Sequence, residues 1–396
     1  MKNCIDDLAM FGGMPAFPEQ LHVGRPNVPD RRKLLERIEG MLDTVWFTNN
    51  GPLVQEFEQR LAEYVGVKHA VAMCNATVAQ QIVTRAAGLT GEVIVPSFTF
   101  VATAHALQWQ EITPVFCDID PETLTLDPDR VEELITPRTS AIIGVHVFGR
   151  ACAVDRLEAI ADRHGLTLMF DAAHALACTW RGTRIGGFGR AEFLSFHATK
   201  FAHAFEGGAV TTNDDELAEA CRLMRNFGFA GHDRVIHVGT NGKLTEVCAA
   251  MGLTSLDCLD QLIEVNRQNL ATYRDALAGV PGLRLLEPPV GEQTNAQYVI
   301  VDIDENTFGL SRDALVRILH AENILVRRYF FPGCHRMEPY ASLAPQSWRW
   351  LPVTERATQR VLSLPTGLAV SGSAITEIGL LLGFLSRTAP EVLRRI

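Results

Sequence analysis

Two stretches, Phe170-Asp171-Ala172-Ala173-His174 and Ser195-Phe196-His197-Ala198-Thr199-Lys200, decide the fold of this 396-residue chain. The first follows an apolar run at residues 166–170 that is typical of a buried strand, and it places a carboxylate at the strand's end. The second follows a strand-like run at 193–196 and ends in a lysine. Ligands of open α/β sheets bind at the carboxyl ends of strands. The two stretches therefore predict a site where an acid and a lysine face one ligand.

An acid and a lysine at two strand ends are what a pyridoxal-phosphate site requires. The lysine amine forms an imine with the cofactor aldehyde, and the acid keeps the pyridine nitrogen protonated, so that the ring accepts electrons. Apolar residues and a Gly-Gly pair follow Lys200, and burial lowers the pKa of a lysine amine, which suits this chemistry. Taken alone, Asp171 is more often a helix N-cap and Lys200 more often a surface lysine. The rest of the chain has to support the pair.

Composition limits the classes of protein. The chain is 47% hydrophobic and 21% charged, which is typical of a soluble globular protein with room for two domains. Its net charge of −10 argues against nucleic-acid binding. We find no signal-peptide pattern at the start and no run long enough to span a membrane. Nine scattered cysteines without a CxxC pair predict reduced thiols in a cytoplasmic protein, and the histidines lack metal-binding spacing.

The periodicity of the chain predicts an α/β fold. Seven runs read as continuously apolar strands: 69–73, 92–96, 113–118, 141–147, 166–170, 193–196 and 208–212. Helical patterns alternate with them, so the sheet is expected to be mostly parallel and covered on both faces. Shorter strands and helices after residue 278 predict a smaller α+β domain. We place the large domain, with an irregular N-terminal arm, at 1–265 and the small C-terminal domain at 266–396.

Several further residues are candidates for binding a cofactor. Asn75-Ala76-Thr77 lies between a strand and a helix, where backbone N–H groups and a hydroxyl make a phosphate cradle, although an ordinary N-cap explains the same residues. Ser195 is a second candidate for the phosphate, and Phe100 for stacking on a ring. His174 is placed to hydrogen-bond a ring hydroxyl. No dinucleotide or P-loop motif is present.

Together these stretches resemble the sugar-nucleotide aminotransferases of the DegT/DnrJ/EryC1/StrS family over nearly the whole chain. The matching segments are residues 48–58, 95–103, 115–121, 146–149, 171–174, 195–200 and 206–210. The resemblance implies a fold type I pyridoxal-phosphate aminotransferase with a seven-stranded sheet. The chain departs from the family pattern in reading Asn-Ala-Thr where Asn-Gly-Thr is frequent, and in having few glycines after Lys200.

The resemblance also implies roles for individual residues. Lys200 and Asp171 would be catalytic, as the imine lysine and the partner of the pyridine nitrogen. The other cofactor contacts within the same chain would be Ala76, Thr77, Phe100, His174 and Ser195. Asn241 would reach the cofactor phosphate of the partner subunit, which implies a homodimer with shared active sites.

The segment 327–335 resembles the substrate loop of the family branch that acts at C4 of nucleotide-linked 4-keto-6-deoxyhexoses. It implies TDP-4-keto-6-deoxyglucose as substrate and L-glutamate as amino donor. The substrate contacts would be Arg327, Tyr329, Phe330 and His335, with the arginine fork matched to phosphate oxygens. An ordinary strand edge explains these arginines as well. Two alternatives stay open: amination at C3 or of another cyclic ketone such as a scyllo-inosose, and a non-catalytic regulator that only binds the cofactor.

Overall fold

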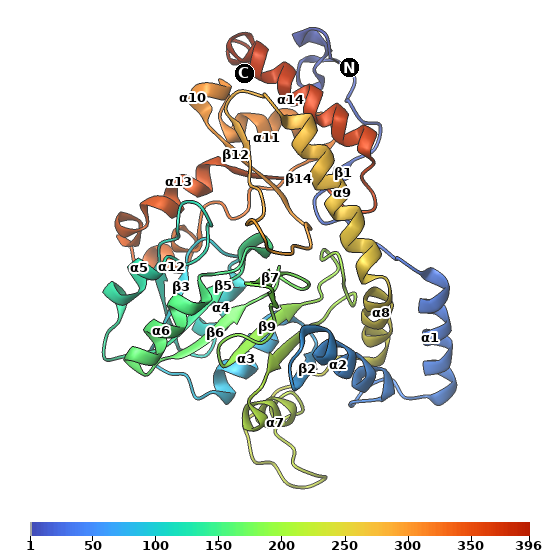
Figure 1. Ribbon diagram of the computed structural model, residues 1–396, viewed down its shortest axis with the longest axis vertical. Helices are drawn as coiled ribbons and strands as arrows, with labels where there is room; N and C mark the ends of the chain where they lie inside the picture. Colours follow the sequence, from blue (N-terminus) through green and yellow to red (C-terminus); the bar gives the residue numbers. More distant parts are fainter. Residues whose placement is uncertain (1) are drawn as a thin grey trace.

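The computed structural model describes residues 2–396 (Figure 1). These residues form a large lower lobe and a smaller upper lobe, called the lower (or large) layer and the upper layer below. The lower layer is built on a seven-stranded sheet with the order β2-β10-β9-β6-β5-β3-β4. In that order the strands are His69–Met73, Gly208–Thr212, Ala191–Ser195, Thr167–Asp171, Thr139–Val145, Glu92–Pro96 and Thr113–Cys117. β10 runs antiparallel to both of its neighbours, and the pairs β9–β6, β6–β5, β5–β3 and β3–β4 are parallel. The predicted α/β fold with a mostly parallel seven-stranded sheet is confirmed.

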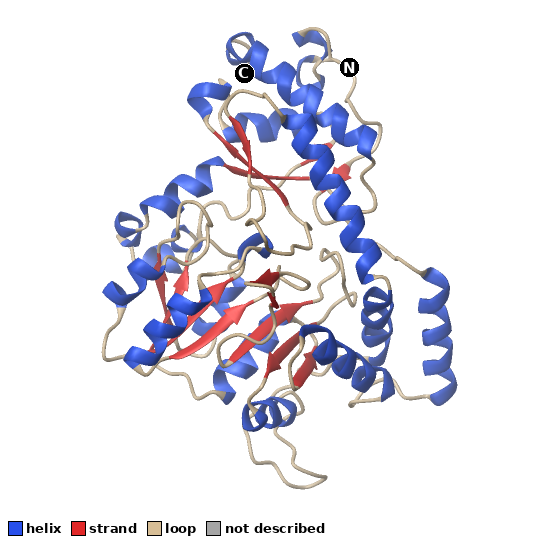
Figure 2. Ribbon diagram, in the orientation of Figure 1, coloured by secondary structure: helices blue, strands red, loops and turns tan. Residues whose placement is uncertain are grey.

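Helices cover both faces of this sheet, which explains why its strands are apolar throughout (Figure 2). One face packs against α3 (Ala76–Ala86), α4 (Ala102–Gln108) and α7 (Asp215–Met224). The other packs against α2 (Pro52–Val65), α6 (Val154–His164) and α8 (Glu246–Asp257). Since all parallel strands end at the same edge, the residues that follow β2, β3, β5, β6 and β9 gather there.

The upper layer is an antiparallel sheet, β11-β12-β14, formed by Leu283–Leu285, Val299–Ile303 and Val361–Leu364. It packs against α11 (Arg312–Ala321), α14 (Gly372–Leu393) and the upper half of α9 (Leu259–Leu277). α9 is one continuous helix that runs from the lower layer into the upper one (Figure 1). The connection 326–360 contains α12 (Tyr340–Leu343) and α13 (Pro352–Arg360). The division at residue 265 stays a prediction, and it falls inside α9.

The N-terminal arm lies against the upper layer, although the predicted division assigned it to the large domain. Ile5, Leu8 and Phe17 belong to the same hydrophobic cluster as α11 and α14. β1 (Leu21–His22) pairs in parallel with β13 (Ile324–Leu325). The arm then reaches α1 (Arg31–Thr44), which packs on α8. The arm has too little apolar surface to fold alone, so long-range packing decides its place.

Within residues 2–396 no helix combines the length and the apolar character needed to cross a bilayer. In the same part of the chain all nine cysteines are free, and no cluster of three or more His, Cys, Asp or Glu side chains is arranged to hold a metal ion.

Candidate active site

Asp171 is the last residue of β6, and its buried carboxylate accepts two hydrogen bonds. Thr103 Oγ1 donates to Oδ2 at 2.8 Å, and the Ala173 N–H donates to Oδ1 at 3.0 Å. Burial raises the pKa of Asp171, and the two donors oppose that rise by stabilising the charged form. These two hydrogen bonds fix the orientation of the carboxylate and favour its charged form, which a cationic ligand group would need.

His174 lies three residues further along the chain and has one N–H group, on Nε2, that can donate a hydrogen bond. Its Nδ1 accepts the Phe148 backbone N–H at 3.1 Å, so the proton of the neutral ring is on Nε2. Burial, together with the charge of Lys200, lowers the pKa of His174 well below its usual value. The imidazole is therefore neutral near pH 7 and acts as a hydrogen-bond donor through Nε2.

Lys200 lies in the connection between β9 and β10. Its amine Nζ is 3.2 Å from the Tyr298 hydroxyl, which comes from the upper layer. Burial lowers the pKa of Lys200 to about 8, although the Asp171 charge acts in the opposite direction. A substantial fraction of the amine is neutral at pH 7–8, which a nucleophile or a proton acceptor needs.

The predicted phosphate cradle is the start of α3. The Asn75 side chain caps the helix by accepting the Val78 N–H at 2.8 Å. In residues 2–396 the N–H groups of Ala76 and Thr77 donate to no other protein group. Ser195 pairs with Gly208 across the sheet, and a Cβ on Gly208 would lie 2.4 Å from the Ala76 nitrogen. Glycine at position 208 therefore lets β10 approach the start of α3 closely, next to its pairing with Ser195.

A cavity of about 400 Å³ opens beside this site. Its lining includes Phe100, Arg327, Tyr329 and Phe330 of the predicted residues. The Phe100 ring is 60% exposed. Phe330 is buried, and its ring lies 5.9 Å from His174 in a stacked arrangement. The Arg327 guanidinium lies 5.7 Å from the centre of the Tyr329 ring.

His335 and Asn241 have other surroundings. The His335 ring lies between Ser97 Oγ, 2.7 Å from Nδ1, and Glu355 Oε1, 2.5 Å from Nε2, and it is not among the residues that line the cavity. With a fully buried side chain, it fastens the connection 326–360 to the end of β3. Asn241 is exposed and pairs with Asn226 in an isolated bridge. Within a single chain the structure therefore does not test its predicted role.

Sequence reasoning missed the residues that orient this site. Thr103 was not singled out because it is one of many threonines in a helical pattern. Tyr298 comes from the loop that precedes β12, 98 residues away from Lys200. Asn295 donates from Nδ2 to the carbonyl oxygens of His174 and Leu176, at 2.9 and 2.8 Å. No local pattern marks such contacts, since they exist only after the two layers pack.

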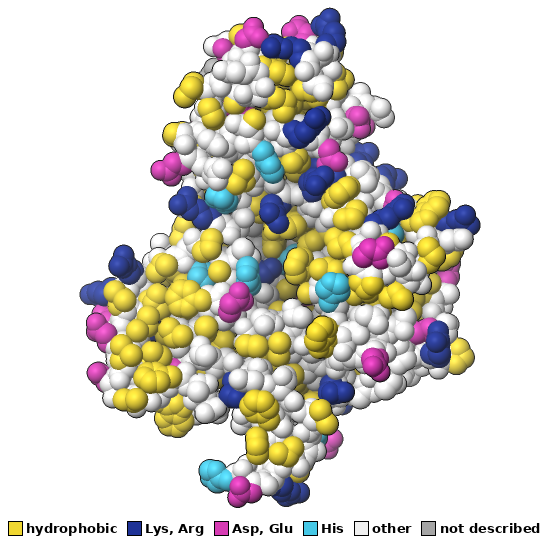
Figure 3. Space-filling model, turned by 180° about the vertical axis from the view of Figure 1, so that it is seen from behind, with side chains coloured by type: hydrophobic (Ala, Val, Ile, Leu, Met, Phe, Trp, Pro, Cys, Tyr) yellow, Lys and Arg dark blue, Asp and Glu magenta, His cyan; other side chains and the backbone are white. Residues whose placement is uncertain are grey.

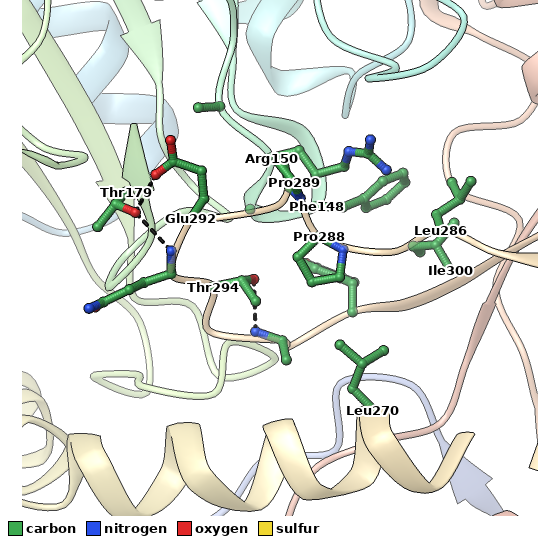
Figure 4. A pocket seen from close by; sticks show the side chains of 15 residues that line it. Phe148, Arg150, Thr179, Leu270, Leu286, Pro288, Pro289, Glu292, Thr294 and Ile300 are labelled. Atoms are coloured by element: carbon green, nitrogen blue, oxygen red, sulfur yellow. Dashed lines mark hydrogen bonds between the residues drawn. The ribbon is translucent and has the colours of Figure 1, made fainter. Parts of the chain in front are cut away.

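The loop 286–298 that carries these residues is fastened to the large layer (Figure 4). Thr179 Oγ1 donates to Glu292 Oε2 at 2.6 Å and accepts the Gln293 N–H at 2.8 Å. The cavity beneath the loop, of about 20 Å³, has room for about one water. It is too small for a cofactor, so the site lies at the sheet edge and not here.

The fold and the site define an α/β enzyme of the aminotransferase class. The chain belongs to the DegT/DnrJ/EryC1/StrS aminotransferase family, whose model matches residues 29–381. It is 35% identical over 361 residues to the dTDP-4-amino-4,6-dideoxy-D-glucose transaminase of Escherichia coli, covering 91% of this chain and 97% of that one. It is 37% identical over 344 residues to the GDP-perosamine synthase of Caulobacter vibrioides, covering 85% and 91%.

Among solved structures, DesI in the presence of its TDP-sugar product superimposes with a TM-score of 0.95 at 52% identity, over 99% of each chain. The family resemblance predicted from the sequence is confirmed, and so is the prediction of an aminotransferase. The alternative of a non-catalytic regulator is not supported by these relatives.

Proposed function

We propose that the protein is a pyridoxal-phosphate-dependent aminotransferase that aminates C4 of a nucleotide-linked 4-keto-6-deoxyhexose, TDP-4-keto-6-deoxyglucose, with L-glutamate as donor. One observation carries the proposal. A lysine amine with a lowered pKa lies at the same sheet edge as a buried carboxylate, beside a cavity that contains an arginine without a carboxylate partner in residues 2–396.

The residues present fit the cofactor. The amides of Ala76 and Thr77 and the Ser195 hydroxyl would bind its phosphate. Because Gly208 has no side chain, the space beside the Ala76 amide stays free for an anion. Asp171 would accept a hydrogen bond from the protonated ring nitrogen, and His174 Nε2–H would donate one to the ring oxygen. Phe100, which is exposed in the absence of a ligand, would cover one face of the ring.

Bound there, pyridoxal phosphate would supply an aldehyde that condenses with amines and a ring that accepts the electron pair left on a deprotonated carbon. Lys200 would then move the proton: its neutral Nζ would accept the proton from Cα of the amino donor and give it to the cofactor carbon that had carried the aldehyde oxygen. Asp171 keeps its charge while the ring nitrogen is protonated, because Thr103 and Ala173 both donate to it.

Arg327 is the residue that would bind the substrate diphosphate. Its neighbour Arg328 already pairs with Asp313 at 3.0 Å and lies 4.4 Å from the centre of the Phe331 ring. Both arginines line the cavity, but Arg327 has no carboxylate partner in residues 2–396. An arginine fork suits phosphate oxygens. TDP as the carrier is supported by the TDP-sugar product in the DesI structure, and C4 by the name of the Escherichia coli relative.

We also propose a homodimer in which Asn241 completes the partner's site. The segment 227–238 exposes five large apolar side chains: Phe227, Phe229, Val235, Ile236 and Val238. Apolar atoms are visible on the loop that protrudes at the bottom of Figure 3. A monomer rarely leaves such a patch uncovered. Asn241 follows this patch directly and is exposed.

The dimer has its own test. Lys200→Ala and Asn241→Ala are each expected to be nearly inactive when pure. Mixed after unfolding and refolding together, they should recover about a quarter of wild-type activity, because half of the dimers are mixed and one site in each of these is intact. No recovery would place Asn241 in the same chain's site.

The function is tested by incubating the holoenzyme with L-glutamate labelled with ¹⁵N and TDP-4-keto-6-deoxyglucose. We expect 2-oxoglutarate and a sugar whose ¹⁵N is attached to C4, as located by NMR. A label on C3, or turnover only with another ketone such as a scyllo-inosose, would overturn the assignment of the substrate. Absence of 2-oxoglutarate with every ketone would overturn the assignment of the donor.

A further inference from the structure

We propose that Tyr298 is a further catalytic residue, whose hydroxyl hydrogen-bonds the Lys200 amine and holds it in place for proton transfer. The inference rests on the proposed function for the identity of the reaction. It does not depend on which sugar is the substrate.

The geometry places Tyr298 directly against the reacting amine. Its hydroxyl oxygen is 3.2 Å from Lys200 Nζ, and its ring centre is 5.8 Å from the same atom. The ring also packs against His174 at 4.6 Å and Phe148 at 5.6 Å between centroids. Tyr298 therefore contacts both Lys200 and His174, although it comes from the upper layer of the fold.

The position of Tyr298 is set by contacts with the large layer. Three residues earlier, Asn295 donates to the carbonyl oxygens of His174 and Leu176. Gln297 donates from Nε2 to the same His174 oxygen at 2.9 Å. Glu292 and Gln293, at the base of the loop, bond Thr179 (Figure 4). Because these bonds run to the segment that follows Asp171, the hydroxyl is held in register with the acid and with the lysine.

The hydroxyl suits both protonation states of the lysine. When Nζ is neutral, the Tyr298 O–H donates a hydrogen bond to its lone pair, which fixes the position of the amine. When Nζ has accepted a proton, the oxygen accepts one of its N–H groups. Burial raises the pKa of Tyr298 well above its usual value, so the phenol keeps its proton throughout and no net proton leaves the pair.

Five titratable groups face one another here. The Asp171 charge acts on Lys200, the Lys200 charge acts on His174, Tyr298 hydrogen-bonds Lys200, and Tyr329 approaches Tyr298 with ring centroids 6.1 Å apart. Asp171 favours the charged amine, whereas burial disfavours it. A hydrogen bond to the ammonium is stronger than one to the neutral amine. Loss of the hydroxyl should therefore lower the pKa of Lys200 further.

The test is Tyr298→Phe, which keeps the ring and removes only the hydroxyl. The chain has five lysines, at positions 2, 33, 68, 200 and 243, so the pH dependence of acetylation of each is readily followed by mass spectrometry. In the cofactor-free protein we expect the Lys200 midpoint to fall by about one pH unit. In the holoenzyme we expect the glutamate half-reaction to slow about tenfold to a hundredfold, with little change in the KM for glutamate.

Tyr273→Phe is the matched control, because its buried hydroxyl donates to the Pro365 carbonyl at 2.7 Å, far from the lysine in sequence and in the other layer's core. It should change thermal stability but neither the Lys200 midpoint nor the half-reaction. A Tyr298→Phe protein with the wild-type midpoint and the wild-type half-reaction rate would overturn the inference. If instead the wild-type enzyme transferred no amine, the proposed function would fail, while the labelling midpoints would still decide the role of Tyr298.

Discussion

Replacing Thr103 by valine isolates the contribution of one hydroxyl to the acid of the site. Thr103 Oγ1 donates to Asp171 Oδ2 at 2.8 Å, and both side chains are buried. Valine has nearly the same shape, so the packing of α4 is retained and one donor to the carboxylate is lost. A hydrogen bond to a charged group contributes about 1.5–3 kcal/mol, and one pKa unit corresponds to about 1.4 kcal/mol. The substitution should therefore raise the pKa of Asp171 by about one to two units.

The sign of the effect follows from which form is stabilised. Burial already raises the pKa of Asp171. With one donor fewer, the carboxylate takes up a proton at a higher pH, and activity that depends on its charge is lost at that higher pH. The acid limb of the rate profile of the glutamate half-reaction, followed by the absorbance of the cofactor, should move upward by the same one to two units.

Thr99→Val is the matched control for this prediction. Thr99 Oγ1 lies 3.0 Å from Thr103 Oγ1 and does not bond the carboxylate itself. Its acid limb should move by clearly less than that of Thr103→Val. If the acid limb of Thr103→Val coincides with that of the wild type, the hydroxyl does not stabilise the charged acid, and the assigned role of Asp171 loses its support.

Three other predictions concern the cradle, the lysine and the cavity. Gly208→Ala puts a Cβ 2.4 Å from the Ala76 nitrogen, so the start of α3 must shift by about 1 Å; we expect at least about tenfold weaker cofactor binding by fluorescence titration, and unchanged affinity would contradict the cradle. Lys200→Met should stabilise the cofactor-free protein at pH 7 by up to about 3 kcal/mol, measured as the free energy of unfolding in urea. The reason is that folding lowers the pKa of Lys200 from 10.5 to about 8, so burying the charged amine costs stability below about pH 10. A destabilised variant would refute this. Arg327→Gln should raise the KM for the nucleotide sugar about tenfold or more, whereas Arg328→Gln, which loses its pair with Asp313, should affect it less; equal effects would argue against a diphosphate at Arg327.

Local pattern was sufficient for most of the large layer. The ends of β2, β3 and β10 agree with the ranges predicted from sequence. Each of these elements is a short buried run bounded by turn residues, and that signal is contained in the element itself. Asp171 was recognisable for the same reason, since it directly follows such a run.

Elements of the upper layer were harder to predict because tertiary contacts make them. α13 and β14 were not predicted: α13 is polar, and β14 is a four-residue edge strand that exists through its pairing with β12. β1 is two residues long and pairs with β13, about 300 residues away. Such strands have little intrinsic preference, so the sequence around them contains no periodic signal.

The same distinction applies to the site. Lys200 is marked by its position after a strand, but its neighbour Tyr298 is defined only by the folded loop 286–298. His335 shows the reverse case. The resemblance of residues 327–335 to a substrate loop predicted a substrate contact, and in the structure Ser97, 238 residues away, and Glu355 lie against its two ring nitrogens. In sequence, a histidine whose two ring nitrogens are hydrogen-bonded within the protein cannot be told apart from one that faces a ligand.

The central claim is that Lys200 is the residue that bonds the cofactor. Borohydride reduction of the holoenzyme, followed by digestion and mass spectrometry, tests it directly because a reduced cofactor adduct stays on its lysine. We predict one adduct, on the peptide that contains Lys200, and none on the lysines at 2, 33, 68 and 243. An adduct on any of those four, or none on Lys200 in a protein that binds the cofactor stoichiometrically, would contradict the account.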